Sequence, residues 1–261
     1  MAKIFIGPAG TGGAELENFK KLKQAGVDGV ELEFTYGIWL TKEQAEKIKE
    51  LNKTLGLRLS IHAPYFINLN SEDAKKVGAS RSRILKSLEV AKYVGANFVV
   101  FHPGFYLKSS KEDTYNKIKE QLGKLKKEAQ EKNLDFHILA PETTGKATAF
   151  GDLDETLKLS KELGCSICVD FAHLKARYNG NIDYPSIIKK LKDSGLKKIH
   201  AHFSGIEYTS KGERKHLITQ EKDIKELFSY LNELNMEISI INESPQPLED
   251  AIKMKKLLGG M

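Results

Sequence analysis

The sequence predicts a (β/α)8 barrel, or TIM barrel, and two features indicate this fold. Eight short apolar runs alternate with longer amphipathic segments, in units of roughly 30 residues with no linker or low-complexity stretch between them. The length of 261 residues is one that α/β barrels use as a single domain, so we expect one domain over residues 1–261. An open, doubly wound sheet is the alternative. The glycine cluster at residues 7–13 argues against it, because the cluster has neither the G-x-G-x-x-G spacing nor the lysine of a phosphate-binding loop.

The expected strands are the apolar runs at residues 4–7, 30–34, 57–62, 98–102, 136–140, 167–170, 199–203 and 238–242. The expected helices lie between them; residues 42–55 and 84–94, for example, carry apolar side chains at helical spacing. Several helices are expected to end at a glycine just before the next strand, because glycine readily adopts the left-handed conformation at a helix end. These glycines are Gly26, Gly56, Gly95, Gly164 and Gly195. A helix start is expected between Thr41 and Gln44.

The fifth run leads into the sequence Leu139-Ala-Pro-Glu-Thr-Thr-Gly145. Residues 134–139 are predicted to form a buried strand that the proline ends, so that Glu142 points into a site rather than into bulk water. Six strand-like runs end on a residue that can bind a metal: His62, His102, Glu142, Asp170, His202 and Glu243. Because the catalytic residues of a barrel come from the C-terminal ends of several strands, we expect these six to converge on one metal cluster.

Imidazoles and carboxylates together suit Zn²⁺, Mn²⁺ or Fe²⁺, whereas the near absence of cysteine argues against a structural sulfur site. A single histidine at a strand end is more commonly a hydrogen-bonded core residue. Several in one chain are harder to explain that way, because buried unpaired polar groups are costly. Two or three ions at close range suit hydrolysis of a phosphate ester, and a metal pair equally supports isomerisation of a sugar. The pattern alone leaves both reactions open.

The net charge of +6 and the pI near 9.0 favour an anionic partner, which could be nucleic acid, a phosphorylated metabolite or a membrane surface. The two cysteines, Cys165 and Cys168, form a C-x-x-C that leads into a strand and has no second pair, so we expect a structural role and a reducing compartment. The N-terminal residues do not resemble a signal peptide, and no apolar run approaches the about 20 residues of a membrane span. We therefore expect a cytoplasmic protein that does not enter a membrane.

Six motifs resemble those of the endonuclease IV family. They are His62-Ala-Pro-Tyr65, Phe101-His102-Pro-Gly104, Pro141-Glu142-Thr-Thr-Gly145, Val169-Asp170-Phe-Ala-His173, Ala201-His202-Phe and Asn242-Glu243-Ser-Pro, and they occur in the family's order. The family comprises zinc-dependent apurinic/apyrimidinic endonucleases built on a barrel that xylose isomerases share. The resemblance implies a DNA-repair hydrolase that cleaves the phosphodiester on the 5′ side of an abasic site in duplex DNA. We expect it to act as a monomer.

The resemblance also implies a centre of two or three zinc ions, for which Mn²⁺ could substitute. The implied ligands are His62, His102 and Glu142 for one ion; Glu142 again, with Asp170, His202 and Glu243, for a second; and His173 for a third. Glu142 and Glu243 would be the catalytic residues. Glu243 would also orient or deprotonate the attacking water.

The last pair of ligands to the third ion departs from the family pattern. In the family this pair reads Asp-x-His, whereas this chain has Glu213-Arg-Lys-His216, with Lys215 in the place of the histidine. Because an ammonium group cannot ligate zinc, we expect Glu213 and His216 to complete the third site. A solvated basic loop is the alternative.

The loop after the second strand lacks the arginine that the family inserts into DNA. Tyr36 or Trp39 is expected to stack on the DNA instead, with simple packing as the alternative. Tyr65 matches an aromatic residue that the family uses at the DNA, and packing on the barrel rim is again the alternative. Glu31 and Glu33 alternate along the second strand and could bind sugar hydroxyls from the barrel interior, although an ion pair with a lysine is the commoner arrangement.

Two other functions stay open. One is a metal-dependent sugar isomerase or epimerase of the xylose isomerase-like superfamily, which usually has fewer imidazoles and binds one or two metals. The other is a metal-stabilised DNA-binding protein without activity. A content near three zinc ions per chain would favour the nuclease, and bound zinc without nicking would favour the inactive DNA-binding protein.

Overall fold

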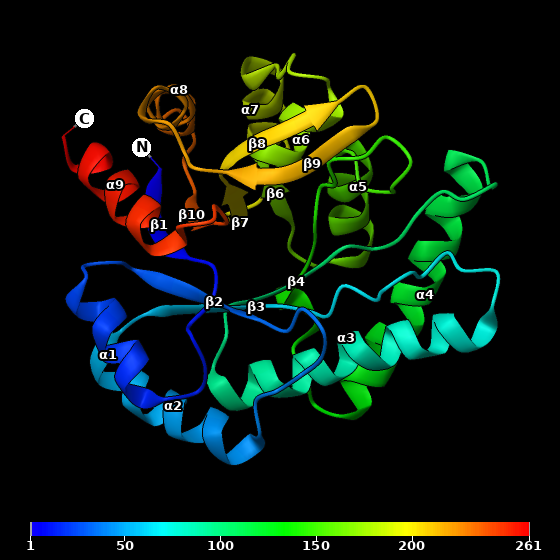
Figure 1. Ribbon diagram of the computed structural model, residues 1–261. Coiled ribbons are helices and arrows are strands. Elements are labelled where there is room, and N and C mark those ends of the chain that lie inside the picture. Colours follow the sequence, from blue (N-terminus) through cyan, green and yellow to red (C-terminus); the bar gives the residue numbers. More distant parts are fainter. Residues whose placement is uncertain (1, 261) are drawn as a thin grey trace.

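The computed structural model describes residues 2–260, in which parallel strands form the centre and helices surround them (Figure 1). The barrel strands are β1 (Lys3–Pro8), β2 (Gly29–Glu33), β3 (Arg58–His62), β4 (Phe98–Phe101), β5 (Leu139–Pro141), β6 (Cys168–Asp170), β7 (Lys198–Phe203) and β10 (Glu237–Asn242). The helices are α1 (Leu16–Gln24), α2 (Lys42–Leu55), α3 (Ala74–Val94), α4 (Lys111–Glu131), α5 (Leu153–Leu163), α6 (Phe171–Arg177), α7 (Tyr184–Asp193), α8 (Glu221–Leu231) and α9 (Pro247–Gly259). Within residues 2–260, no helix combines the length and the apolar composition that crossing a bilayer requires.

The barrel strands pair as two four-stranded parallel sheets, with the orders β1-β10-β7-β6 and β2-β3-β4-β5. Two narrow seams join these half-barrels into a ring. At one seam Ala9 pairs with Glu31, whose carbonyl accepts a hydrogen bond from the Gly10 amide at 2.9 Å. At the other seam Glu142 forms a single bridge with Cys168. The predicted (β/α)8 barrel is therefore confirmed.

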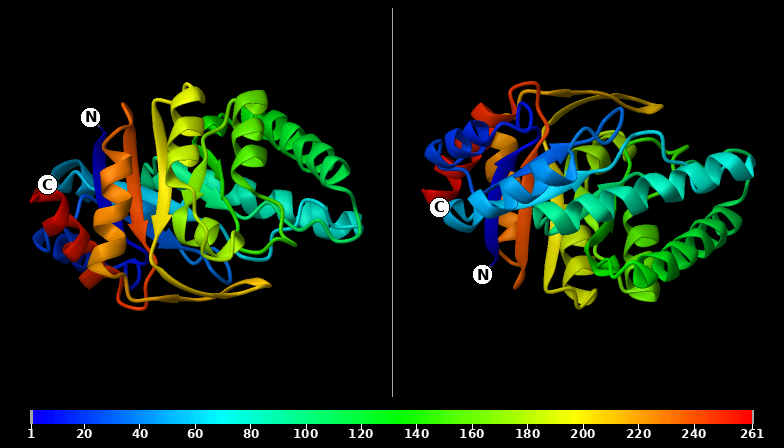
Figure 2. Two further views of the ribbon diagram at one scale, coloured as in Figure 1. Left: turned by 90° about the horizontal axis from the view of Figure 1, so that it is seen from above. Right: turned by 90° about the horizontal axis from the view of Figure 1, so that it is seen from below.

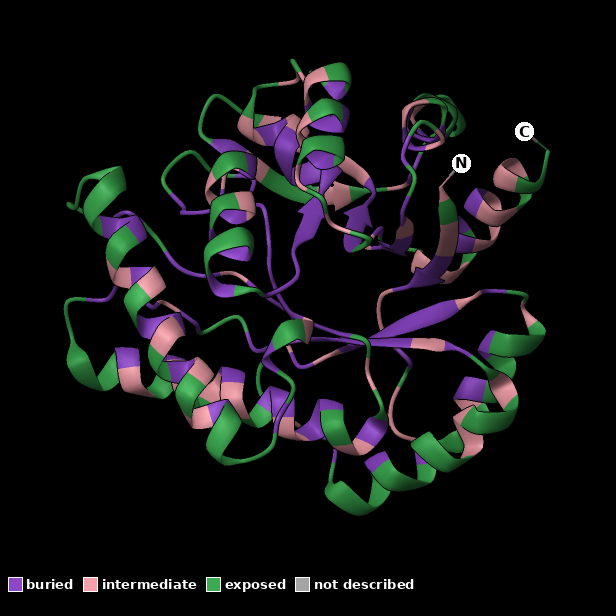
Figure 3. Ribbon diagram, turned by 180° about the vertical axis from the view of Figure 1, so that it is seen from behind, coloured by how far each residue is buried: buried purple, intermediate pink, exposed green. Residues whose placement is uncertain are grey.

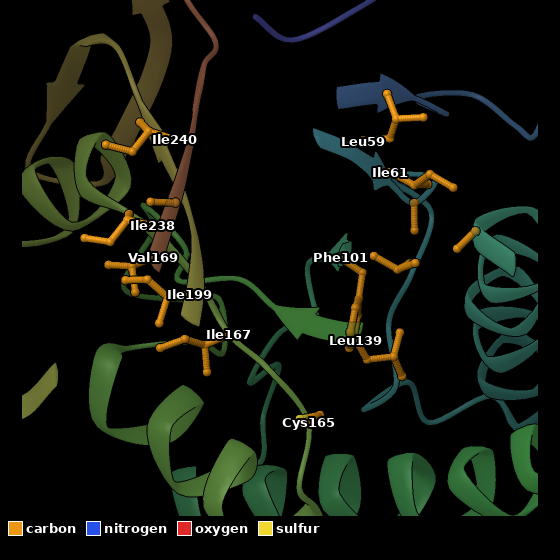
Figure 4. Close-up of a cluster of buried hydrophobic side chains, with 14 of the residues drawn as sticks. Leu59, Ile61, Phe101, Leu139, Cys165, Ile167, Val169, Ile199, Ile238 and Ile240 are labelled. Carbon is orange, nitrogen blue, oxygen red and sulfur yellow. The ribbon is translucent and has the colours of Figure 1, made fainter. Parts of the chain in front are cut away.

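Successive side chains of each strand face the helices and the barrel interior in turn. Leu59 and Ile61 of β3 lie on the outer face, and Val169, Ile199 and Ile238 do so on the other half-barrel (Figure 4). The strands are almost wholly buried, whereas the surrounding helices alternate buried and exposed positions (Figure 3). The positions between the outward residues point inward, and this alternation brings the polar side chains of several strands together inside the ring.

The fifth strand differs from its prediction. Residues Phe136–Ile138 form a short 3-10 helix, η1, because the Asp135 carboxylate accepts a hydrogen bond from the His137 amide at 2.9 Å and so stabilises a turn. The strand does end at Pro141, as predicted, and Pro141 pairs with Phe101 as its last residue. The N–H that proline lacks would face β6, along the seam where pairing is sparse, so the strand tolerates it.

The helix ends follow the sequence signals. Thr41 and Gln44 cap α2 reciprocally: the Gln44 amide donates to the Thr41 hydroxyl at 3.2 Å, and the Thr41 amide donates to the Gln44 side chain at 3.0 Å. Gly56 ends the same helix at φ +66°, in the left-handed region. The two cysteine thiols are free and buried, and burial raises the pKa of Cys165 to about 12, which disfavours a reactive thiolate.

A hairpin that the sequence analysis did not predict interrupts the β–α alternation after β7. Its strands are β8 (Gly205–Thr209) and β9 (Gly212–Leu217), which pair antiparallel. The hairpin lies across the ends toward which β7 and β10 point (Figure 2). It therefore covers part of the C-terminal face, where the predicted metal ligands emerge.

Candidate metal centre

Glu142, which directly follows β5, lies at the centre of the site with no solvent exposure. Its amide donates to the Phe101 carbonyl at 3.0 Å and so continues the ladder with β4. One carboxylate oxygen, Oε2, lies 2.9 Å from His102 Nε2 and 3.2 Å from His62 Nε2. The sequence predicted this trio as one ligand set, and the three donor groups lie within 4.8 Å of one another.

The second oxygen of Glu142, Oε1, faces the opposite half-barrel. It lies 3.2 Å from His202 Nδ1 and 3.1 Å from His173 Nδ1. Glu142, Asp170, His202 and Glu243 form a second group whose donor atoms also lie within 4.8 Å of one another. Glu142 is thus the one residue common to both predicted ligand sets, in the position of a bridging carboxylate.

These two groups fit divalent cations. Asp170 Oδ1 accepts from the His173 amide at 2.7 Å, whereas the buried Oδ2 lies 3.1 Å from His173 Nδ1 but makes no hydrogen bond among residues 2–260. A buried carboxylate oxygen without a donor is costly unless a cation serves it. Neutral imidazoles with carboxylates are the donors that Zn²⁺ and Mn²⁺ accept.

Residues for a third ion lie beside the first two groups. His173 Nε2 is 3.1 Å from Glu213 Oε2, and the His173 and His216 ring centroids are 5.5 Å apart. The Ser204 hydroxyl donates to the Gly205 carbonyl at 2.8 Å, so its oxygen can only accept from His216 Nδ1, 2.7 Å away. This arrangement places the proton of His216 on Nδ1 and leaves the Nε2 lone pair available as a ligand.

A β-bulge explains how the altered spacing still brings both β9 residues to the site. Glu207 pairs with Lys215 and Tyr208 pairs with Glu213, so Arg214 is an extra residue in β9. Residues three apart in a regular strand point to opposite faces, and one extra residue restores a common face for Glu213 and His216. Lys215 points away from the site, with its ammonium 3.3 Å from a Glu207 carboxylate oxygen.

The site's electrostatics are those of carboxylates surrounded by imidazoles. Burial alone would raise the pKa of the Glu142 carboxyl, but the charges of His102 and His202 hold it well below its usual range. Burial would lower the pKa of His62, yet its hydrogen bond to Glu142 and the nearby carboxylates raise it to about 10. Burial raises the pKa of Glu243 to about 8, and the charge of Glu142 adds to this effect while that of His202 opposes it.

These shifts predict opposite pH trends for the metal-free and metal-loaded protein. Because the pKa of His62 is raised in the folded protein, its protonation stabilises the fold. This stabilisation is complete below the ordinary pKa of about 6.5 and is lost as pH rises toward 10, and the raised pKa of Glu243 has an effect in the same direction. Protein stripped with a chelator should therefore melt at lower temperature as pH rises above about 6.5. Zinc must displace those protons, so its affinity should rise over the same range, with proton release measurable by calorimetry in two buffers. Zinc affinity that stays flat with pH would contradict this prediction.

The candidate metal ligands, apart from the fully buried Asp170 and His202, open into a cavity of about 300 Å³. Its lining includes eight of the predicted residues, His62, His102, Glu142, His173, Glu213, His216, Glu243 and Tyr65. Tyr65 is 54% exposed and stands edge-on to His62, with the ring centroids 5.4 Å apart. Phe105 and Lys146 also line the cavity and were missed by the sequence analysis, although both follow a predicted ligand in its own loop.

The other two predicted DNA contacts lie outside this cavity. Tyr36 is 86% exposed, and Trp39 donates from Nε1 to the Glu33 carbonyl at 2.8 Å and packs edge-on against Phe34. Their contact with DNA stays a prediction. The lysine partner expected for Glu31 is wrong: Glu31 is fully buried inside the barrel, with its carboxylate between His200 and His202. Because the Glu31 side chain points into the barrel, the lysines on the protein surface cannot reach it.

A closed β–α barrel with clustered imidazoles and carboxylates at its C-terminal mouth defines a class of barrel proteins with a candidate metal site. The chain belongs to the xylose isomerase-like TIM barrel family, whose model matches residues 19–258. An uncharacterized protein of Methanocaldococcus jannaschii is 39% identical over 266 residues, covering 97% of this chain and 96% of that protein. A probable endonuclease 4 of Mesomycoplasma hyopneumoniae is 29% identical over 162 residues, which cover 59% of this chain and 56% of that protein.

Solved structures share the fold. The endonuclease IV of Thermus thermophilus superposes with a TM-score of 0.74 at 19% identity, covering 100% of this chain and 99% of its own. A D-tagatose 3-epimerase-like protein superposes with a TM-score of 0.74 at 21% identity, covering 99% and 96%. At these identities the superpositions establish the barrel, while the choice between nuclease and epimerase depends on the site.

Proposed function

We propose that the protein is a zinc-dependent apurinic/apyrimidinic endonuclease that hydrolyses the phosphodiester 5′ to an abasic site in duplex DNA. The observation that carries this proposal is the number of imidazoles in addition to the group of Glu142, Asp170, His202 and Glu243. That group alone would hold one ion, which suffices for a sugar epimerase. His62 and His102 on one side, and His173 with His216 on the other, add donors for further ions on both sides of Glu142. A multinuclear site is suited to phosphodiester hydrolysis, because several charges must be offset at once.

The residues of the chain divide the work. Zinc ions bound here would supply Lewis acidity toward the phosphate and would lower the pKa of a bound water. Glu142 positions the ligands of both half-barrels through its two oxygens. Glu243, with its side chain 15% exposed at the cavity, is placed to accept a proton from the attacking water. Lys146 at the cavity wall can donate to a phosphate oxygen, since its ammonium is held only loosely, 3.8 Å from Glu213.

Binding to DNA is supported by charge and by the aromatic rim. The net charge of +6 provides cationic side chains for phosphate contacts, so affinity should fall with salt. Tyr65 presents more than half of its surface beside the ligand His62, where it can stack on an unpaired base or hold the helix open at the lesion.

The test is a duplex that contains one tetrahydrofuran abasic analogue. Zinc-loaded protein is expected to nick on the 5′ side of the analogue and leave a 3′-hydroxyl, to lose this activity on chelation, and to leave the undamaged duplex intact. Tyr65→Ala should weaken binding to the abasic duplex by about 5- to 150-fold, the equivalent of about 1–3 kcal/mol of stacking, with unchanged zinc content. A protein that carries two or three zinc ions but nicks nothing would reject the proposal, and epimerisation of a ketose by the same sample would favour the sugar enzyme.

A further inference from the structure

Below the predicted metal ligands, the barrel interior holds a carboxylate, Glu31, that the sequence analysis placed in no ligand set, although its donor atom lies within 4.8 Å of those of Glu33 and Glu243. Glu31 of β2 is fully buried, and its two oxygens face two imidazoles of β7. Oε2 accepts a hydrogen bond from His200 Nε2 at 2.8 Å, and Oε1 lies 2.8 Å from His202 Nε2. Among residues 2–260, neither Glu31 Oε1 nor His202 Nε2 has a hydrogen-bond partner, and the two atoms lie close enough for a small rotation of either side chain to join them.

His202 uses its two ring nitrogens in different directions. Nδ1 faces the cation site, 3.2 Å from Glu142 Oε1 and 3.3 Å from Glu243 Oε1. Nε2 faces down the barrel to Glu31. An imidazole can ligate a cation through Nδ1 only if that nitrogen carries a lone pair, and the ring proton must then reside on Nε2.

We propose that Glu31 is a positioning residue that holds the proton of His202 on Nε2 and thereby presents the Nδ1 lone pair to the cation shared with Glu142 and Glu243. Carboxylates that accept from the distal nitrogen of a ligating histidine fix its tautomer and ring orientation. The proposal rests on the metal centre of the proposed function, but it concerns zinc binding and not the substrate.

His200 completes the arrangement by fixing Glu31 itself. Its hydrogen bond occupies Oε2, and its ring packs on Phe98 at 5.0 Å between centroids. Because the hydrogen bond from His200 fixes Oε2, the carboxylate cannot rotate freely and Oε1 stays oriented toward His202 Nε2. This anchoring also accounts for an ionisable side chain in a barrel interior that includes the apolar cluster Phe98, Val100, Ala140 and Cys168.

The test compares Glu31→Leu, which removes both acceptors, with Glu31→Gln, which keeps the shape and one acceptor oxygen. Zinc affinity is measured by competition with a chelator, and the tautomer of His202 is read from ¹⁵N chemical shifts of the zinc-loaded protein. Glu31→Leu should weaken the binding of one zinc ion by about 10- to 100-fold, and Glu31→Gln should recover most of that loss. Ser239→Ala, which also removes a buried polar group from the barrel interior, should leave the affinity unchanged.

The outcomes separate this proposal from the proposed function. Wild-type zinc affinity in both Glu31 variants, or a wild-type His202 that is protonated on Nδ1 when zinc is bound, would overturn the role of Glu31. If Glu31→Leu does not fold, the tautomer in the wild-type protein and the affinity of Glu31→Gln relative to Ser239→Ala decide the matter. A wild-type protein that binds zinc but does not cleave abasic DNA would reject the nuclease and leave the role of Glu31 standing.

Discussion

Glu142→Ala is expected to remove most of the bound metal and to reduce cleavage of abasic DNA by at least about three orders of magnitude. The side chain contacts all four imidazoles of His62, His102, His173 and His202. In the proposed centre its loss would deprive two ions of a shared ligand and would remove several kcal/mol of stabilisation from the transition state, where about 1.4 kcal/mol corresponds to tenfold in rate. Metal content by atomic emission and single-turnover cleavage provide the measurement.

The control for this prediction is a glutamate at the opposite end of the barrel. Glu237 begins β10 and pairs with Arg58 at 2.7 Å, so Glu237→Ala should keep both metal and rate. Removing Glu142 also leaves buried imidazoles without a counter-charge, which is itself destabilising. Glu142→Gln, which keeps the shape, therefore accompanies the alanine variant. A folded Glu142→Gln protein with normal metal content and rate would refute the cluster.

His216→Ala is expected to lower the zinc content by about one ion per chain and the cleavage rate by about two orders of magnitude or more, because a third ion would lose a ligand. The bulge offers a sharper comparison. Deletion of Arg214 removes the extra residue and turns the sequence into Glu-Lys-His, with the two ligands now two apart in a regular strand. Because they would again share one face, the deletion should keep the third ion.

Lys215→Ala serves as the matched control, since that side chain points to Glu207 and away from the cavity. It should leave the zinc content and the rate unchanged. Two results would contradict the assignment of the hairpin as the source of the third site's ligands. One is a His216→Ala protein that keeps all of its zinc. The other is loss of an ion on deletion of Arg214 when His216→Ala keeps that ion.

Much of the barrel followed from local rules. Apolar runs and glycine-terminated helices located the strands, and the strand ends then gave Glu142, Asp170 and their companions, because parallel strands in a ring all open at one mouth. These rules did not predict the 3-10 turn before β5. It depends on one capping contact, from the His137 amide to Asp135, which competes with strand formation in a run that is otherwise apolar.

Features that depend on distant partners were harder to predict. The alternation along β2 allowed Glu31 to face inward, but an ion pair with a lysine was the commoner expectation, because the histidine partners are about 170 residues away and are set by closure of the ring. The β8–β9 hairpin carries polar residues on both faces, so its periodicity resembles that of a loop. The sequence analysis expected Glu213 and His216 at the site without the bulge that brings them there.

Because the two half-barrels are joined only by sparse strand pairing, bound cations would stabilise the barrel as well as take part in the chemistry. Each half-barrel contributes its own imidazoles, and one carboxylate at the seam between β5 and β6 reaches both. Ions bound there would hold the two half-barrels together where the strand pairing is sparse, since a ligand that binds only the closed barrel stabilises it against opening. Integrity of the scaffold and readiness for reaction would then depend on the same supply of metal.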